Sequence, residues 1–139
     1  MTRMNSNRAR ALPAPYTRPM ERGRFRRLVL RALESIPPEF GPYLDNIAIV
    51  IEREPSREDL RAGRVASTDE LFGLYVGVPL TERAGGDPVL PARIVIYQGP
   101  LERHFRPAQI PRQIRKTVIH EVGHHFGIDE ARLRRLGVG

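Results

Sequence analysis

The segment His120-Glu121-Val122-Gly123-His124 constrains this chain more than any other, because its spacing brings the three polar side chains together only on a helix. Side chains four positions apart project from one helix face about one turn from each other, so His120 and His124 can share one metal ion. Glu121 lies toward the same side, where it can take a proton from a metal-bound water. The pattern therefore predicts a helix that carries two imidazole ligands for zinc and a general base.

The residues around this segment divide the predicted helix into two faces. The apolar face contains residues at helical spacing: Ile114, Val118, Val122 and His125. His120 and His124 belong to another stripe, well separated from the first. Because His125 falls on the apolar stripe, we expect it to be buried and bonded to a neighbouring backbone group, or to support a ligand, rather than to bind the metal.

A catalytic zinc ion usually has three protein ligands and one water, so the motif needs a third residue. Gly127 can adopt a positive φ, end the helix and turn the chain back toward the metal. Glu130, ten residues after His120, occupies the position of the third ligand in compact zinc peptidases and is our first candidate. Asp129 is the second candidate, and an upstream residue is the third. Alternatively, both acids cap the next short helix.

The absence of cysteine bears on the kind of metal site. A closed structural zinc site has four protein ligands and commonly uses thiolates, so an open, catalytic site is favoured. The mechanism that follows is zinc-assisted peptide hydrolysis, with Glu121 passing a proton to the leaving amine. An extended peptide could lie along an exposed strand edge. Four residues could stabilise the oxyanion, and the sequence does not choose among Tyr75, Tyr97, His104 and Arg106.

Several segments carry a likeness to a known family. The most specific runs from Thr117 to Glu130 and contains the doubled histidine, a Phe-Gly pair and two adjacent acids. The others are Tyr97–Leu101, Gly73–Arg83 and Ser35–Phe40. Over about residues 21–139 the chain resembles the small bacterial zincin-like metallopeptidases. The resemblance implies a minimal zincin fold, zinc-dependent peptidase activity, and metal ligands at His120, His124 and Glu130. It implies no particular natural substrate.

Positive charge is concentrated near the N-terminus. Residues 1–27 contain eight arginines and one glutamate, whereas residues 28–139 contain fifteen basic and fifteen acidic side chains. We interpret residues 1–20 as a flexible basic arm and residues 21–139 as a single metallopeptidase domain. An arginine-rich arm could contact phosphates, so the alternative function is a catalytically weak zinc-binding module that binds peptide or nucleic acid. Tyr16 is the one aromatic residue in this arm, whereas proteins that bind single-stranded nucleic acid stack several aromatic side chains on the bases, so a solvated tail is favoured.

No segment of the sequence predicts a membrane partner. The longest aliphatic stretch, residues 47–51, is too short to cross a bilayer. The N-terminus has arginines but lacks the apolar region of a secretory signal. We therefore expect a cytoplasmic monomer that acts on a peptide or protein substrate.

Apolar periodicity predicts an α+β fold. We expect a sheet of three to four strands packed against an N-terminal helix and the HExxH helix, with a short C-terminal helix. The strands are expected at Ile47–Ile51, Leu71–Val78 and Arg93–Tyr97, and the helices at Phe25–Ile36, from between Pro107 and Pro111 through the motif, and at Asp129–Leu136. Arg57–Ala66 is interpreted as a loop with at most one helical turn, and a short connection is expected before the HExxH helix. Gly73 and Gly77 would allow a bend or bulge.

Overall fold

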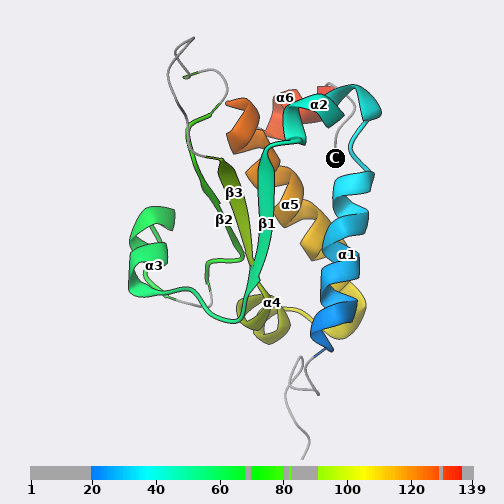
Figure 1. The fold of residues 1–139 in the computed structure, drawn as a ribbon. Helices are drawn as coiled ribbons and strands as arrows, with labels where there is room; N and C mark the ends of the chain where they lie inside the picture. The colour runs from blue at the N-terminus through cyan, green and yellow to red at the C-terminus, as the bar shows by residue number, and fades with distance from the viewer. Residues whose placement is uncertain (1–19, 68–69, 80–81, 83–90, 129, 136–139) are drawn as a thin grey trace, which may run out of the picture.

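The computed structural model describes residues 20–67, 70–79, 82, 91–128 and 130–135 (Figure 1). In this part of the chain a three-stranded sheet packs against helices, so the predicted α+β class is confirmed. The elements are α1 (Arg22–Glu34), a 3₁₀ turn (Pro38–Phe40), α2 (Gly41–Leu44), β1 (Ile47–Glu52), α3 (Arg57–Gly63), β2 (Gly73–Val76), β3 (Ala92–Tyr97), α4 (Gln98–His104), a second 3₁₀ turn (Pro107–Gln109), α5 (Ile110–Phe126) and α6 (Glu130–Arg135). Within these ranges, no helix combines the length and apolar character needed to cross a membrane.

The sheet has the strand order β1-β3-β2, with β3 in the centre. β1 runs parallel to β3, and Ile49 lies opposite Ile94. β2 runs antiparallel to β3, and Tyr75 lies opposite the same Ile94 on the other side. Among the described residues β2 is therefore an edge strand, paired on one of its two sides.

The larger core lies between the sheet and the two long helices. α1 and α5 lie together on one face of the sheet, as Figure 1 shows. Alternation along β3 turns two isoleucines toward these helices. The buried residues of this core include Phe25, Val29 and Ala32 of α1, Ile94 and Ile96 of β3, and Ile114, Val118 and Val122 of α5. The apolar stripe predicted for the HExxH helix is thus its packing surface.

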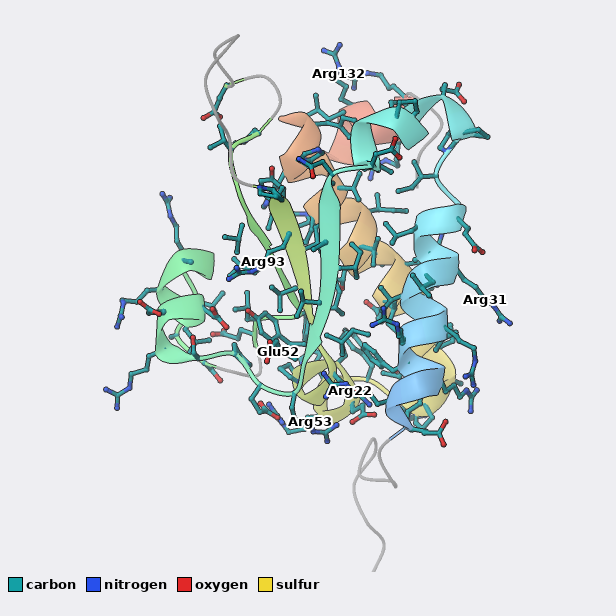
Figure 2. The ribbon with its side chains drawn as sticks, in the orientation of Figure 1. Arg22, Arg31, Glu52, Arg53, Arg93 and Arg132 are labelled. Atoms are coloured by element: carbon teal, nitrogen blue, oxygen red, sulfur yellow. The ribbon has the colours of Figure 1, made fainter. Side chains whose placement is uncertain are left out.

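The opposite face of the sheet carries a smaller core beneath α3. Leu71, Leu74, Val95 and Tyr97 are buried there, with Leu60 and Val65 packed against them. In Figure 2, the side chains of Glu52 and Arg93 also lie on this side of the sheet, whereas Arg31 extends from α1 away from the sheet. Because the two faces bury different residues, each strand has a fixed register.

Two connections are more regular than the sequence predicts. Residues 57–63 form helix α3 rather than a loop, and its start is fixed by a capping box. The Asp59 N–H donates to Ser56 Oγ at 3.1 Å and the Ser56 N–H donates to Asp59 Oδ2 at 3.1 Å. The expected short connection after β3 contains helix α4, in which Gln98–Leu101 are buried. Both predictions were wrong in the same way: they missed a short helix.

Candidate metal centre

Helix α5 positions the motif, and both of its ends have clear causes. Pro111 lies in the first turn, where a missing N–H leaves no hydrogen bond unmade. The helix stops at Gly127, which has a φ of 72°, and the Ile128 N–H donates to the Gly123 carbonyl at 2.9 Å. This left-handed ending favours glycine. The start near Pro111 and the stop at Gly127 agree with the sequence prediction.

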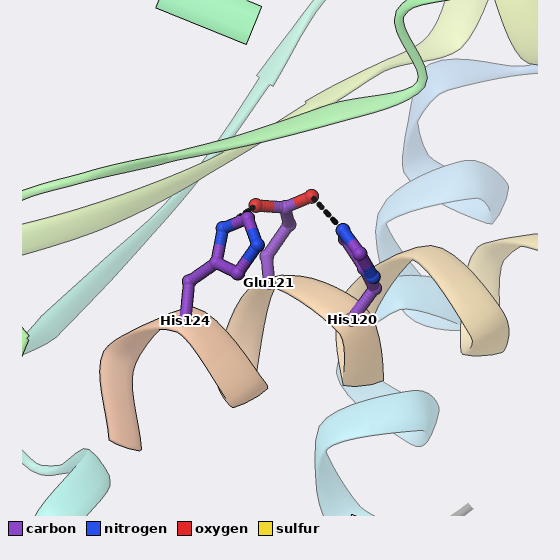
Figure 3. A group of neighbouring side chains, drawn as sticks. All are labelled: His120, Glu121 and His124. Atoms are coloured by element: carbon purple, nitrogen blue, oxygen red, sulfur yellow. Dashed lines mark ion pairs between the residues drawn. The ribbon is translucent and has the colours of Figure 1, made fainter. Parts of the chain in front are cut away.

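The three polar residues of the motif converge above α5 (Figure 3). Ligand atoms of His120, Glu121 and His124 all lie within 4.8 Å of one another. Nε2 of His120 is 3.9 Å from Glu121 Oε2, and Nδ1 of His124 is 3.2 Å from Glu121 Oε1. The two histidine side chains are 48% and 52% exposed, whereas that of Glu121 is 6% exposed. A buried carboxylate therefore lies between two imidazoles that face solvent.

The electrostatics of Glu121 follow from this arrangement. Burial raises the pKa of the carboxyl, while His124, His120 and the backbone N–H of Tyr75 act in the opposite direction. Oε1 is buried, and Nδ1 of His124 lies 3.2 Å from it. A buried carboxylate oxygen is costly unless a neighbouring group donates to it. The imidazole of His124 and the backbone N–H of Tyr75 are the described groups that stabilise the charged carboxylate by hydrogen bonding.

These donors fit a metal of borderline softness. Two imidazole nitrogens and carboxylate oxygens are the ligand types that zinc accepts in open sites. Among the described residues, His120, Glu121 and His124 form the group whose ligand atoms lie close enough to hold an ion.

Comparison with protein families also points to a metal-binding protein. The model of a family described as zincin-like metallopeptidase matches residues 44–139, well over half of the chain. The chain belongs to the zincin-like metallopeptidase family. A comparison with curated proteins found no match. The matched range includes the whole sheet and α5, so the family pattern covers the elements that build the metal centre.

The third ligand of this zincin-like centre remains a prediction. Asp129 lies outside the described residues. Glu130 is the first residue of α6, but its side chain is also outside the described part of the molecule. The structure thus places the backbone of Glu130 just beyond the turn at Gly127, as the sequence predicts.

His125 is buried, as expected, but its contact is with a side chain. It is 1% exposed, and its Nδ1 lies 2.8 Å from the hydroxyl of Tyr75 on β2. At Nδ1 the partner is therefore a tyrosine hydroxyl, and the backbone partner predicted from the sequence stays a prediction for the other ring nitrogen. The same hydroxyl lies 3.2 Å from the carbonyl oxygen of Val78. Tyr75 joins the edge strand to α5 beside the metal centre.

A cavity of about 720 Å³ lies beside the metal centre and is lined by β2, α5 and the end of α3. His120, Glu121 and His124 form part of its wall, together with Tyr75. A second cavity of about 740 Å³ shares Tyr75 and both histidines, and extends toward Gly127. The histidine pair thus stands where two hollows meet, which leaves room for a substrate that continues in both directions.

The structure separates the four oxyanion candidates. Tyr75 lines both cavities. Tyr97 is buried on the opposite face of the sheet, and burial, followed by Asp59 and Glu52, raises the pKa of its phenol. The ring of His104 packs on that of Phe72 with centroids 5.5 Å apart, and Arg106 immediately precedes the 3₁₀ turn at Pro107–Gln109. Neither residue lines the two cavities. Tyr75 is the only one of the four beside the metal centre.

Gly73 has a role that the sequence did not reveal. A Cβ at this position would lie 2.6 Å from Thr117 Cγ2 and 3.3 Å from Glu121 Cγ. The glycine therefore permits β2 to approach α5 closely beside Glu121. A sequence signal exists, because a glycine inside a strand is also typical of close backbone approach.

Proposed function

We propose that this protein hydrolyses peptide bonds with the help of zinc, with Glu121 as general base and His120, His124 and Glu130 as metal ligands. The observation that carries the proposal is the Glu121 carboxylate. It is buried between two half-exposed imidazoles, whose nitrogens lie 3.9 Å and 3.2 Å from its two oxygens. Membership of the zincin-like family supports the same reading.

Zinc bound here would polarise the scissile carbonyl and lower the pKa of water toward neutrality. The remaining tasks fall to residues of this chain. Glu121 accepts the proton of the attacking water through its carboxylate, which lies between the two imidazoles. Burial raises the pKa of this carboxyl, which makes it a better proton acceptor than an exposed glutamate, and it can then pass the proton to the leaving amine.

The edge strand is the natural support for the substrate. β2 is paired on one side only within the sheet and runs along the first cavity. An extended peptide that adds to this edge gains backbone hydrogen bonds, as in other cases of strand addition. Its scissile bond would then lie beside the two histidines. Tyr75, at the meeting point of the cavities, is our choice for the residue that stabilises the oxyanion.

The test compares wild type with Glu121→Gln, each loaded with zinc and offered a mixture of peptides. We expect both proteins to retain zinc, because Glu121 is assigned no coordinating role. We expect cleavage by the variant to fall by roughly a hundredfold to ten-thousandfold, since a positioned general base contributes about that much. Equal cleavage by both proteins would remove Glu121 from the mechanism. Zinc binding without cleavage by wild type would favour the alternative of a zinc-binding module.

A further inference from the structure

The two cavities that meet at the histidine pair differ in character. The second is lined by Pro79, Ile128 and Ala131 besides the shared residues, and it offers small and apolar surfaces. The first contains the aromatic rings of Phe72 and Phe105 and the basic side chains of Arg64 and Lys116. A peptide that crosses the metal centre would therefore meet different chemistry on its two sides.

The two basic residues of the first cavity have no acidic partner among the described residues. Within the described residues, neither Lys116 nor Arg64 forms a salt bridge. The acidic residues that line the same cavity are Glu70 and Glu121. Glu70 Oε1 accepts a hydrogen bond from the backbone N–H of Ser67 at 3.1 Å, and Glu121 lies buried between the histidines. Apart from Glu121, the described residues that line this cavity therefore include two cations, Arg64 and Lys116, and one carboxylate, Glu70.

The distance between Lys116 and the metal centre corresponds to a small number of residues in a bound peptide. Lys116 precedes His120 by four positions on α5, which corresponds to about 6 Å along a helix axis. β2 advances in the same sense but at an angle to α5, because Gly73 approaches Thr117 and Tyr75, two residues on, contacts His125, eight residues on. An extended peptide beside β2 advances about 3.3 Å per residue. Lys116 is thus within about two substrate residues of the bond held at the histidines.

We propose that the first cavity is a subsite for an acidic side chain, which Lys116 binds with the help of Arg64, about two residues from the scissile bond. This proposal rests on the proposed function, and it assigns a substrate class to the same cleft. The second cavity then receives a small or apolar side chain on the other side of that bond. The substrate is an internal segment of an acidic peptide, since both sides of the metal centre offer room.

Binding tests the subsite independently of catalysis. The zinc-loaded Glu121→Gln protein is titrated with fluorescein-labelled peptides that share one neutral sequence and differ by a single glutamate or glutamine at successive positions. We expect the glutamate peptide to bind about fivefold more tightly at one position, as a partly exposed ion pair allows. Added Lys116→Gln should abolish the difference, and Lys116→Glu should reverse it. Arg115→Gln is the matched control, because Arg115 is the adjacent cation and bonds to Ser35 Oγ instead.

Equal binding of the two peptides at every position would overturn the proposal, as would a preference that survives replacement of both Lys116 and Arg64 by glutamine. An oligonucleotide that displaces the peptide from this protein but not from the Lys116→Glu variant would assign the cavity to phosphates instead, and would also overturn it. Cleavage sites in a peptide mixture, read by mass spectrometry with wild type, separate the two proposals. Acid-selective binding without any cleavage contradicts the proposed function and supports the subsite. Cleavage without a preference for acidic peptides supports the proposed function and contradicts the subsite.

Discussion

The hydroxyl of Tyr75 and Nδ1 of His125 lie 2.8 Å apart, and this contact joins the edge strand β2 to the helix that carries the metal centre. The two residues are fifty positions apart in the chain, so the contact is a tertiary one. A hydrogen bond from the backbone N–H of Tyr75 also acts to lower the pKa of the Glu121 carboxyl. One residue of β2 therefore links the buried His125 and the Glu121 carboxylate.

Replacement of Tyr75 by phenylalanine removes this contact and keeps the ring. We expect the free energy of unfolding to fall by about 1 to 2 kcal/mol, the range for losing a partner of a buried polar group. We also expect kcat to fall more than KM rises, because the hydroxyl is assigned to the oxyanion. Urea denaturation and steady-state kinetics measure the two effects. Unchanged stability would show that the contact contributes nothing to the fold.

Tyr97→Phe is the matched comparison on the other face of the sheet. The Tyr97 hydroxyl is buried next to the Asp59 carboxylate, so its removal should lower the free energy of unfolding at neutral pH by no more than about 1 kcal/mol. Because burial raises the pKa of this phenol in the folded protein, its stabilising effect is present below the ordinary value of 10.0 and is lost as the pH rises further. The variant should lose less stability than wild type when urea midpoints are compared on either side of that pH. A steeper alkaline loss in the variant would contradict this reading.

Gly73→Ala tests the close approach of β2 to α5. The new methyl would collide with Thr117 Cγ2, so we expect a loss of about 2 kcal/mol in the free energy of unfolding. Thr117→Ser removes that methyl and retains the hydroxyl that donates to the Gln113 carbonyl. The double variant should therefore be more stable than the sum of the single effects predicts. Gly41→Ala is the control, because a Cβ there meets nothing within 4 Å. Strict additivity at positions 73 and 117 would place the strain elsewhere.

Glu130→Ala tests the third metal ligand, with Asp129→Ala as its neighbour control. If Glu130 completes the site, its loss should weaken zinc binding by at least tenfold, while the Asp129 variant binds as wild type does. Competition with a chromophoric chelator gives the zinc affinities. Weaker zinc binding by the Asp129 variant alone would assign the third ligand to Asp129. Unchanged zinc binding by both variants would assign it to a residue upstream.

The elements that the sequence predicted well are those with a long local signal. The apolar stripe of α5, together with Pro111 and Gly127, indicated a helix of the right extent. The three strands were recognised from aliphatic runs, with boundaries that shifted by one or two residues. Family membership followed from the motif and its surroundings.

Apart from α3, whose capping box is a local signal, the features that were missed depend on contacts between distant segments. Helix α4 begins Gln98-Gly99-Pro100, which is typical of a turn. A Cβ at Gly99 would lie 2.0 Å from Glu54 Oε2, so that helix packs closely on a segment far away in sequence. The tyrosine partner of His125 and the approach of Gly73 to Thr117 are likewise set by the register of β2 on α5. No local pattern reports such distances.

The most direct measurement is the rate of peptide cleavage by wild type before chelation, after chelation, and after one equivalent of zinc is returned. The account predicts that chelation abolishes cleavage and that zinc restores it, whereas Glu121→Gln treated identically binds zinc and stays inactive. Cleavage that persists in the chelated protein, or that zinc restores equally to the Glu121→Gln variant, would contradict a zinc peptidase that uses Glu121 as its base.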